Sequence, residues 1–120
     1  MENTKIKTLI EKNLPFSIFT KPGQGVVTKT QTIAQELGFE SVFLGWGSSL
    51  DTLGNLQSQI ENGEKFILII EEFDCIPYNV AKNLLDFIEN RSGMFPTAII
   101  HHSENEVTQM LKDRSLQVEL

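Results

Sequence analysis

Short apolar stretches alternate with amphipathic helical stretches five times along the chain, and this alternation limits the possible folds more than any other feature. The clearest apolar stretch is FILII at residues 66–70, which has no polar position. Such a run is typical of a central parallel strand that helices cover on both faces. Alternating strands and helices form parallel sheets with helices on both sides. We therefore predict an α/β fold, a three-layer α-β-α sandwich with a five-stranded parallel sheet.

The helices and strands are predicted from periodicity and from the Gly, Pro and Asn residues that end them. The helices are expected near residues 2–13, 25–37, 53–63, 77–91 and 105–113. The strands are expected at residues 16–19, 41–46, 66–72, 97–102 and 116–120.

Composition excludes several classes of function. The formal net charge is −6, and no cluster of Lys and Arg interrupts the acidic background. Nucleic acids and anionic membrane surfaces both attract basic patches, so neither is an expected partner. A protein partner or a small ligand remains.

The N-terminus and the cysteine content indicate the compartment. Residues 1–13 are charged and lack the apolar core of a signal peptide, and no apolar run approaches the roughly 18 residues of a membrane span. Cys75 is the one cysteine, so it cannot form an internal disulfide. We expect a cytoplasmic protein with a reduced, buried thiol.

Polar residues follow three of the predicted strands. Residues 20–25 (TKPGQG) follow the first strand, Glu71 and Glu72 end the third, and residues 101–103 (HHS) end the fourth. Because ligands bind at the carboxyl ends of parallel strands, we expect any site to lie there.

The loop after the first strand fits a phosphate-binding motif in one register. Residues 23–30, from Gly23 to Thr30, match the spacing G-x-x-x-x-G-K-[ST], with Thr28 in place of the second glycine. In this register Lys29 would bind phosphate and Thr30 would bind magnesium.

Taken in order, the segments resemble the core of an AAA+ ATPase, and particularly its MoxR-type branch. The resemblance comes from a strand, a loop similar to GPPGxGKT, a helix ending in A-x-E-L-G at residues 34–38, and an apolar strand ending in two acids. It covers nearly the whole chain, and it implies the strand order 5-1-4-3-2.

This resemblance favours a second register of the loop. Residues 20–27 (TKPGQGVV) then match GPPGxGKT, so Val26 takes the position of the phosphate-binding lysine and Val27 that of the magnesium-binding hydroxyl. The helix continues without a gap to residues 34–38, and Thr28, with its branched Cβ, need not replace a glycine. Valine can do neither task, although the amides around Gly23 and Gly25 can still attract an anion.

The resemblance also implies roles for other residues. Glu71 takes the position of an aspartate that supports magnesium, and Glu72 that of a catalytic glutamate, while Arg114 matches an arginine that reaches a neighbouring subunit's phosphate. With the altered loop, Glu72 and Arg114 are vestigial, and Glu71 has a metal role only if magnesium binds. Acids often end a buried strand, and arginines often lie near helix C-termini, so structural roles are equally open.

The two histidines lie near the family's polar sensor position. His101 and His102 are adjacent on a strand and should point to opposite faces, which makes a joint metal site unfavourable. No metal is predicted there.

We expect residues 1–120 to be a single AAA+-like core domain without the helical lid that follows the fifth strand in this family. The leading hypothesis is a catalytically inactive AAA+-like module that binds a protein partner, possibly a full-length AAA+ protein. It would need no cofactor and would be a monomer or small oligomer. The alternative is a minimal nucleotide-binding protein or ATPase that uses Gly23 to Thr30 with ATP and Mg²⁺. A third possibility is a shared α/β architecture alone, for which a strand order of 2-1-3-4-5 would be evidence.

Overall fold

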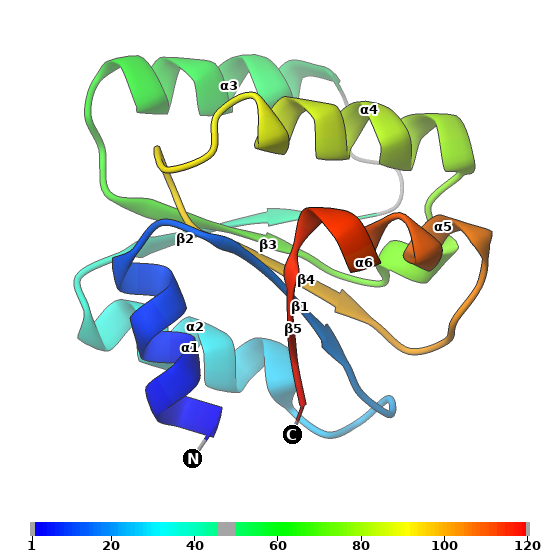
Figure 1. Cartoon of the computed structure of the whole chain (residues 1–120). Helices are drawn as coiled ribbons and strands as arrows, with labels where there is room; N and C mark the ends of the chain where they lie inside the picture. Colours follow the sequence, from blue (N-terminus) through cyan, green and yellow to red (C-terminus); the bar gives the residue numbers. More distant parts are fainter. Residues whose placement is uncertain (1, 46–49, 120) are drawn as a thin grey trace.

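The computed structural model describes residues 2–45 and 50–119, and it contains one parallel β-sheet with helices on both faces (Figure 1). The strands are β1 (Pro15–Phe19), β2 (Glu40–Leu44), β3 (Phe66–Ile70), β4 (Thr97–His101) and β5 (Leu116–Val118). The helices are α1 (Glu2–Glu11), α2 (Val26–Glu36), α3 (Leu50–Glu61), the 3-10 turn η1 (Phe73–Cys75), α4 (Tyr78–Glu89), α5 (Glu106–Gln109) and α6 (Leu111–Arg114).

The sheet has the order β2-β3-β4-β1-β5, and every pair of neighbouring strands is parallel. Read from the other edge, this is the order 5-1-4-3-2, so both the fold class and the implied strand order are confirmed. The flavodoxin-like order 2-1-3-4-5 is excluded.

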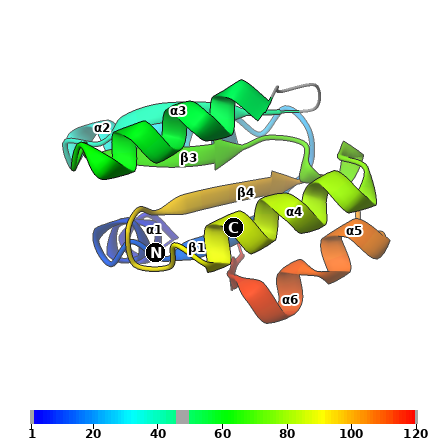
Figure 2. The same ribbon diagram turned by 90° about the horizontal axis from the view of Figure 1, so that it is seen from above.

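The sheet divides the core into two layers. Helices α1 and α2 cover one face, and α3 and α4 cover the other, as the view from above also shows (Figures 1 and 2). In β3, Ile67 and Ile69 pack on the α1 and α2 side, while Phe66, Leu68 and Ile70 pack on the α3 and α4 side. Burial on both faces explains why FILII has no polar position.

Helix α2 begins and ends at glycines. Gly25 precedes it with φ +69°, in the left-handed region, and Gly38 follows it with φ +86°. The amide of Gly38 donates to the carbonyl of Gln35. Glycine adopts positive φ without the strain that a Cβ brings, so the predicted C-terminal stop at Gly38 is confirmed.

Most predicted elements differ from the observed ones by a few residues at their ends, and two differ in a way that the structure explains or leaves undescribed. The helix expected at residues 105–113 is divided into α5 and α6, because the amide of Met110 bonds three residues back to Val107 and tightens the turn. The second strand ends at Leu44, and Trp46, its last predicted residue, lies outside the described residues.

The expectation of a buried thiol is wrong, because the side chain of Cys75 is exposed. In this turn Phe73 and Ile76 fill the buried positions, which leaves Cys75 facing solvent. Desolvation, followed by the negative charges of Asp74 and Glu72, raises the pKa of the thiol, which therefore lacks the activation of a nucleophilic cysteine.

None of the helices in the described part of the chain combines the length and the hydropathy that a membrane span requires.

Candidate functional site

The carboxyl edge of the sheet carries the loop at residues 20–25, which we call the glycine loop. Residues 21–25 are exposed, and Gly23 and Gly25 have φ values of +83° and +69°. A Cβ at either glycine would meet no atom within 4 Å. The glycines are therefore required by the backbone conformation of the loop and not by close packing.

The four residues that distinguish the two registers all lie in α2. Val26 is its first residue and is buried, and Val27 packs against the same core from a half-buried position. The hydroxyl of Thr30 is buried and donates to the carbonyl of Val26 at 2.8 Å. Lys29 is exposed, and its amide donates to the carbonyl of Gly25 at 3.0 Å. The Thr30 hydroxyl is thus already used inside the helix.

A cavity of about 140 Å³ lies against the glycine loop. It is lined by residues 23–28 together with Thr20, Lys21, Ile100 and His102. Nδ1 of His102 lies 2.7 Å from the carbonyl oxygen of Thr20, so this nitrogen carries the proton and donates it. Ligand sites usually enclose about 300–1,000 Å³, so this cavity is small for a nucleotide.

A second, more open depression of about 610 Å³ adjoins the loop. Lys21 and Lys29 both line it, together with Phe19, Gln24 and parts of Thr20 and Val26. It is the place at this edge where Lys29 could meet an anion.

Glu71 and Glu72 follow β3 but differ in environment. Glu71 is half-buried, and its amide donates to the carbonyl of Leu44 in the edge strand at 3.0 Å. Glu72 is exposed and has φ +50°, a left-handed conformation that is uncommon for a residue with a Cβ. The turn into η1 therefore fixes the backbone of Glu72.

Asp74 forms a network that the sequence reasoning missed. Its Oδ1 accepts from the amide of His102 at 3.1 Å, its Oδ2 accepts from the hydroxyl of Ser103 at 2.7 Å, and its carbonyl accepts from Nδ2 of Asn105 at 2.9 Å. We call these four residues the Asp74 network. The signal that could have revealed it is an acid after β3 facing Ser and Asn after β4, once the two strands are known to be neighbours.

The hydrogen bonds of this network change the charge properties of Asp74. Burial is the largest contribution and raises the pKa of Asp74, but it is outweighed by several lowering contributions together, first the hydrogen bonds from Ser103 and from the backbone of His102. The pKa of Asp74 is therefore lower than its ordinary value. The carboxylate holds η1 against the segment that follows β4.

The two histidines occupy different sites, but they do not share a strand as predicted, because β4 ends at His101 and His102 follows it. His101 is 6% exposed, stacks on Phe19 with 5.3 Å between ring centroids, and has Nδ1 3.3 Å from the carbonyl of Ser103. His102 lies in the cavity of the glycine loop. Among the described residues, no group of three or more His, Cys, Asp or Glu side chains is arranged to hold a metal ion.

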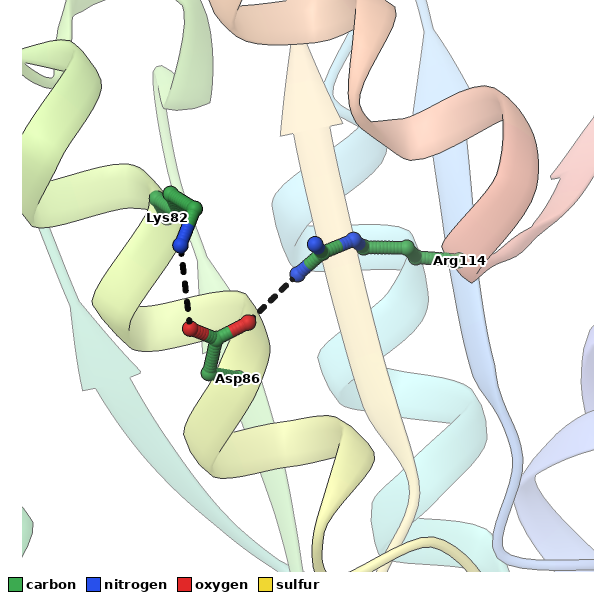
Figure 3. Close-up of polar contacts among 3 residues, drawn as sticks. All are labelled: Lys82, Asp86 and Arg114. Carbon is green, nitrogen blue, oxygen red and sulfur yellow. Dashed lines mark hydrogen bonds and ion pairs between the residues drawn. The ribbon is translucent and has the colours of Figure 1, made fainter.

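Arg114 is paired within its own chain (Figure 3). Its Nη1 donates to Oδ1 of Asp86 in α4 at 2.7 Å, and Lys82 lies 3.7 Å from the other oxygen. The hydrogen bond from Arg114 is the main reason that the pKa of Asp86 is lowered, and the same bond raises the pKa of Arg114. The side chain thus joins α6 to α4.

Comparison with known proteins gives structural matches only. No family model and no curated protein sequence matches the chain. The structure of C. elegans PCH-2 matches with a TM-score of 0.75 and 16% identity, over 98% of this chain and 40% of that one. The Thermotoga maritima RuvB Holliday junction branch migration motor matches with a TM-score of 0.66 and 18% identity, over 99% of this chain and 44% of that one.

Both matching proteins are AAA+ ATPases, and this chain spans less than half the length of each. At 16% and 18% identity, the likeness concerns the fold alone. The chain therefore shares with the matched parts of these proteins an α/β, P-loop NTPase-like fold with a five-stranded parallel sheet.

Proposed function

We propose that this chain is a catalytically inactive AAA+-like module, of the MoxR-type pattern, that acts by binding a partner protein. The observation that carries the proposal is the start of α2 at Val26, directly after the left-handed Gly25. With this start, valines stand where a working loop has its phosphate-binding lysine and magnesium-binding hydroxyl.

The chemistry of hydrolysis depends on those two groups. The lysine places a positive charge on the β- and γ-phosphates, and the hydroxyl helps to hold magnesium. Val26 is buried in the core and cannot be replaced in this task by Lys29, which lies one helical turn further on with an exposed side chain. The amides around Gly23 and Gly25 leave weak anion binding as the most that the loop supplies.

The remaining catalytic positions agree with this proposal. If Val26 and Val27 leave phosphate and magnesium unheld at the loop, Glu72 has no phosphate beside which to polarise water and Glu71 has no metal ion to support. Arg114 would have to break its 2.7 Å hydrogen bond with Asp86 before it could reach a neighbouring subunit. We treat Glu72 and Arg114 as vestigial.

Phosphate release from ATP in the presence of Mg²⁺ tests the catalytic part of the proposal. We expect no release by the wild-type protein above the protein-free rate, and no change in the variants Glu72→Gln or Lys29→Ala. Release that falls sharply in Glu72→Gln would contradict the proposal and would make this glutamate a catalytic residue.

The edge strand β2 is the surface that we assign to a partner. Among the described residues it pairs with β3 alone, and Phe43 on it is 42% exposed. An edge strand can accept a further strand through its free backbone groups. An extended segment of a partner, such as a full-length AAA+ protein, fits this edge.

Light scattering without nucleotide measures the oligomeric state of the chain and tests whether it assembles into a ring without a partner. We expect a monomer or a small oligomer, because neither a bound nucleotide nor a free Arg114 is available to stabilise a ring. A stable ring formed by the wild-type chain alone would overturn this part of the proposal.

The alternative function is a minimal nucleotide-binding protein or ATPase that uses Gly23 to Thr30 as an atypical P-loop. It is favoured by one observation, that Lys21 and Lys29 line the same open depression beside the glycine loop. If this alternative holds, Lys29→Ala should abolish nucleotide binding, whereas Lys5→Ala, a change at an exposed lysine of α1, should not.

A further inference from the structure

A separate cavity of about 340 Å³ lies between the sheet and the segment that connects β4 to β5. Ser17 and Phe19 of β1 and His101 of β4 line it from the sheet, and Leu111 and Lys112 of α6 line it from the helical side. The connecting segment consists of two helices of four residues each. The volume of the cavity lies within the range of small-molecule sites.

His101 brings an unused hydrogen-bond acceptor to this cavity. The side chain is buried, and Nδ1 faces the carbonyl of Ser103, which can only accept, so in the neutral imidazole Nε2 is the acceptor nitrogen. Within the described residues Nε2 of His101 has no hydrogen-bond partner. The side-chain atoms that are both fully buried and without a partner are Ser41 Oγ and Thr97 Oγ1, so Nε2 is not fully buried. Nε2 is thus open to the cavity that His101 lines.

The cavity also offers a flat apolar surface. The Phe19 ring stacks on His101 at an interplanar angle of 26°, and it remains 53% exposed although it is a large apolar group. Leu111 is buried on the opposite wall. A ligand with a planar ring can cover Phe19 while it donates a hydrogen bond to His101.

The charges around the cavity select the charge of the ligand. Glu104 and Glu119 line it with two carboxylates, whereas Lys112 supplies one ammonium. The chain as a whole carries a formal net charge of −6. A cationic ligand is therefore attracted, a neutral ligand is not opposed, and an anionic ligand is repelled.

From this geometry we propose that the cavity binds a small neutral or cationic molecule whose planar ring itself carries an O–H or N–H donor. The ring covers Phe19, and the donor bonds to Nε2 of His101. None of the described residues lines both this cavity and the cavity of the glycine loop that contains His102, whereas Phe19 also lines the open depression beside that loop. The proposal does not depend on the function proposed above.

Titration of the wild-type protein with tyramine, followed by two-dimensional NMR, tests the site. Tyramine is a cation with a phenol, phenethylamine lacks the hydroxyl, and 3-(4-hydroxyphenyl)propionate replaces the cation with an anion. We expect saturable shifts at Phe19, Leu111 and the His101 imidazole with tyramine. Loss of one hydrogen bond should weaken phenethylamine by up to about tenfold, and the anion should bind more weakly than tyramine.

Two variants test whether His101 is responsible for the preference for tyramine over phenethylamine. His101→Phe keeps a ring beside Phe19 but removes the acceptor, so it should bind tyramine and phenethylamine equally. Tyr78→Phe removes a hydroxyl from an exposed residue of α4 outside the cavity and should keep the wild-type preference. Thermal melting checks the folding of each variant.

The wild-type titration decides the matter even if His101→Phe does not fold. Equal binding of tyramine and phenethylamine, shifts confined to residues 20–25, or no saturable shift with any of the three probes at millimolar concentration would each overturn the proposal.

Discussion

The glycine loop and the Asp74 network lie at the same edge of the sheet, but they differ in what their polar groups do. The glycine loop is exposed and takes its shape from Gly23 and Gly25. In the Asp74 network, both carboxylate oxygens of Asp74 are used in hydrogen bonds to the segment after β4. The glycine loop takes its shape from the backbone of two glycines, whereas the Asp74 network uses a carboxylate to hold two segments of the fold together. Polar residues at strand ends are therefore not sufficient evidence of catalysis.

The largest difference between the two regions should appear on removal of a side chain. Asp74→Ala leaves the amide of His102 and the hydroxyl of Ser103 without their acceptor, and it should lower the free energy of unfolding by about 1–3 kcal/mol. The matched change in the glycine loop, Gln24→Ala, removes an exposed side chain and should cost less than about 0.5 kcal/mol. Urea denaturation measures both. Equal losses would mean that the network does not stabilise the fold.

Acid should affect the Asp74 network before it affects the glycine loop. Because the pKa of Asp74 is lowered by folding, its contribution to stability is complete above the unfolded-state pKa of an aspartate, about 4. It is lost as the pH falls through the lower pKa of the folded state. We expect the melting temperature of Asp74→Asn to fall less between pH 5 and pH 2, an interval of about 3 units, than that of the wild type.

The pH profile has a control in the other region. The Gln24→Ala variant should retain the wild-type fall in melting temperature over the same interval. An identical profile for Asp74→Asn would contradict the role that we assign to the Asp74 carboxylate.

Substitutions at two left-handed residues should have opposite signs. Gly25 in the glycine loop has φ +69°, and Glu72 beside the Asp74 network has φ +50°. Gly25→Ala adds a Cβ in this conformation and should destabilise the protein by about 1 kcal/mol, whereas Glu72→Gly should be neutral or stabilise it by up to about 1 kcal/mol. Thermal melting measures both variants. A marked loss of stability in Glu72→Gly would mean that the Glu72 side chain has contacts that outweigh the strain.

The sequence was sufficient to predict the architecture, because hydrophobic period and glycine position act locally. FILII at residues 66–70 indicated a strand covered on both faces, and Gly38 indicated the end of α2. The strand order required the family resemblance, since periodicity carries no information on which strands are neighbours.

The parts that sequence could not predict depend on contacts between distant segments. Asp74 accepts hydrogen bonds from His102 and Ser103, which lie 28 and 29 positions further along the chain. Arg114 donates to Asp86, which lies 28 positions before it. These pairs become visible only when η1, α4 and α6 are placed around the sheet. The exposure of Cys75 was missed because Phe73 and Ile76 take the buried positions of a turn too short to be recognised from periodicity.

The smallest expected effect concerns Arg114. Its pair with Asp86 is partly exposed to solvent, and such pairs stabilise folded proteins only slightly. Arg114→Ala should therefore lower the melting temperature less than Asp74→Ala does, and the loss caused by Arg114→Ala should become smaller still in high salt. A loss as large as that of Asp74→Ala would mean that the pair between α4 and α6 is a main structural contact.

Calorimetric titration of the wild-type protein with ATP in the presence of Mg²⁺ tests most directly whether the glycine loop still binds nucleotide. A loop with Val26 and Val27 in place of lysine and hydroxyl should give no saturable heat at micromolar nucleotide, and addition of Mg²⁺ should not strengthen any weak binding at millimolar nucleotide. A micromolar dissociation constant that requires Mg²⁺ would contradict the inactive module and would favour the alternative that uses Lys29.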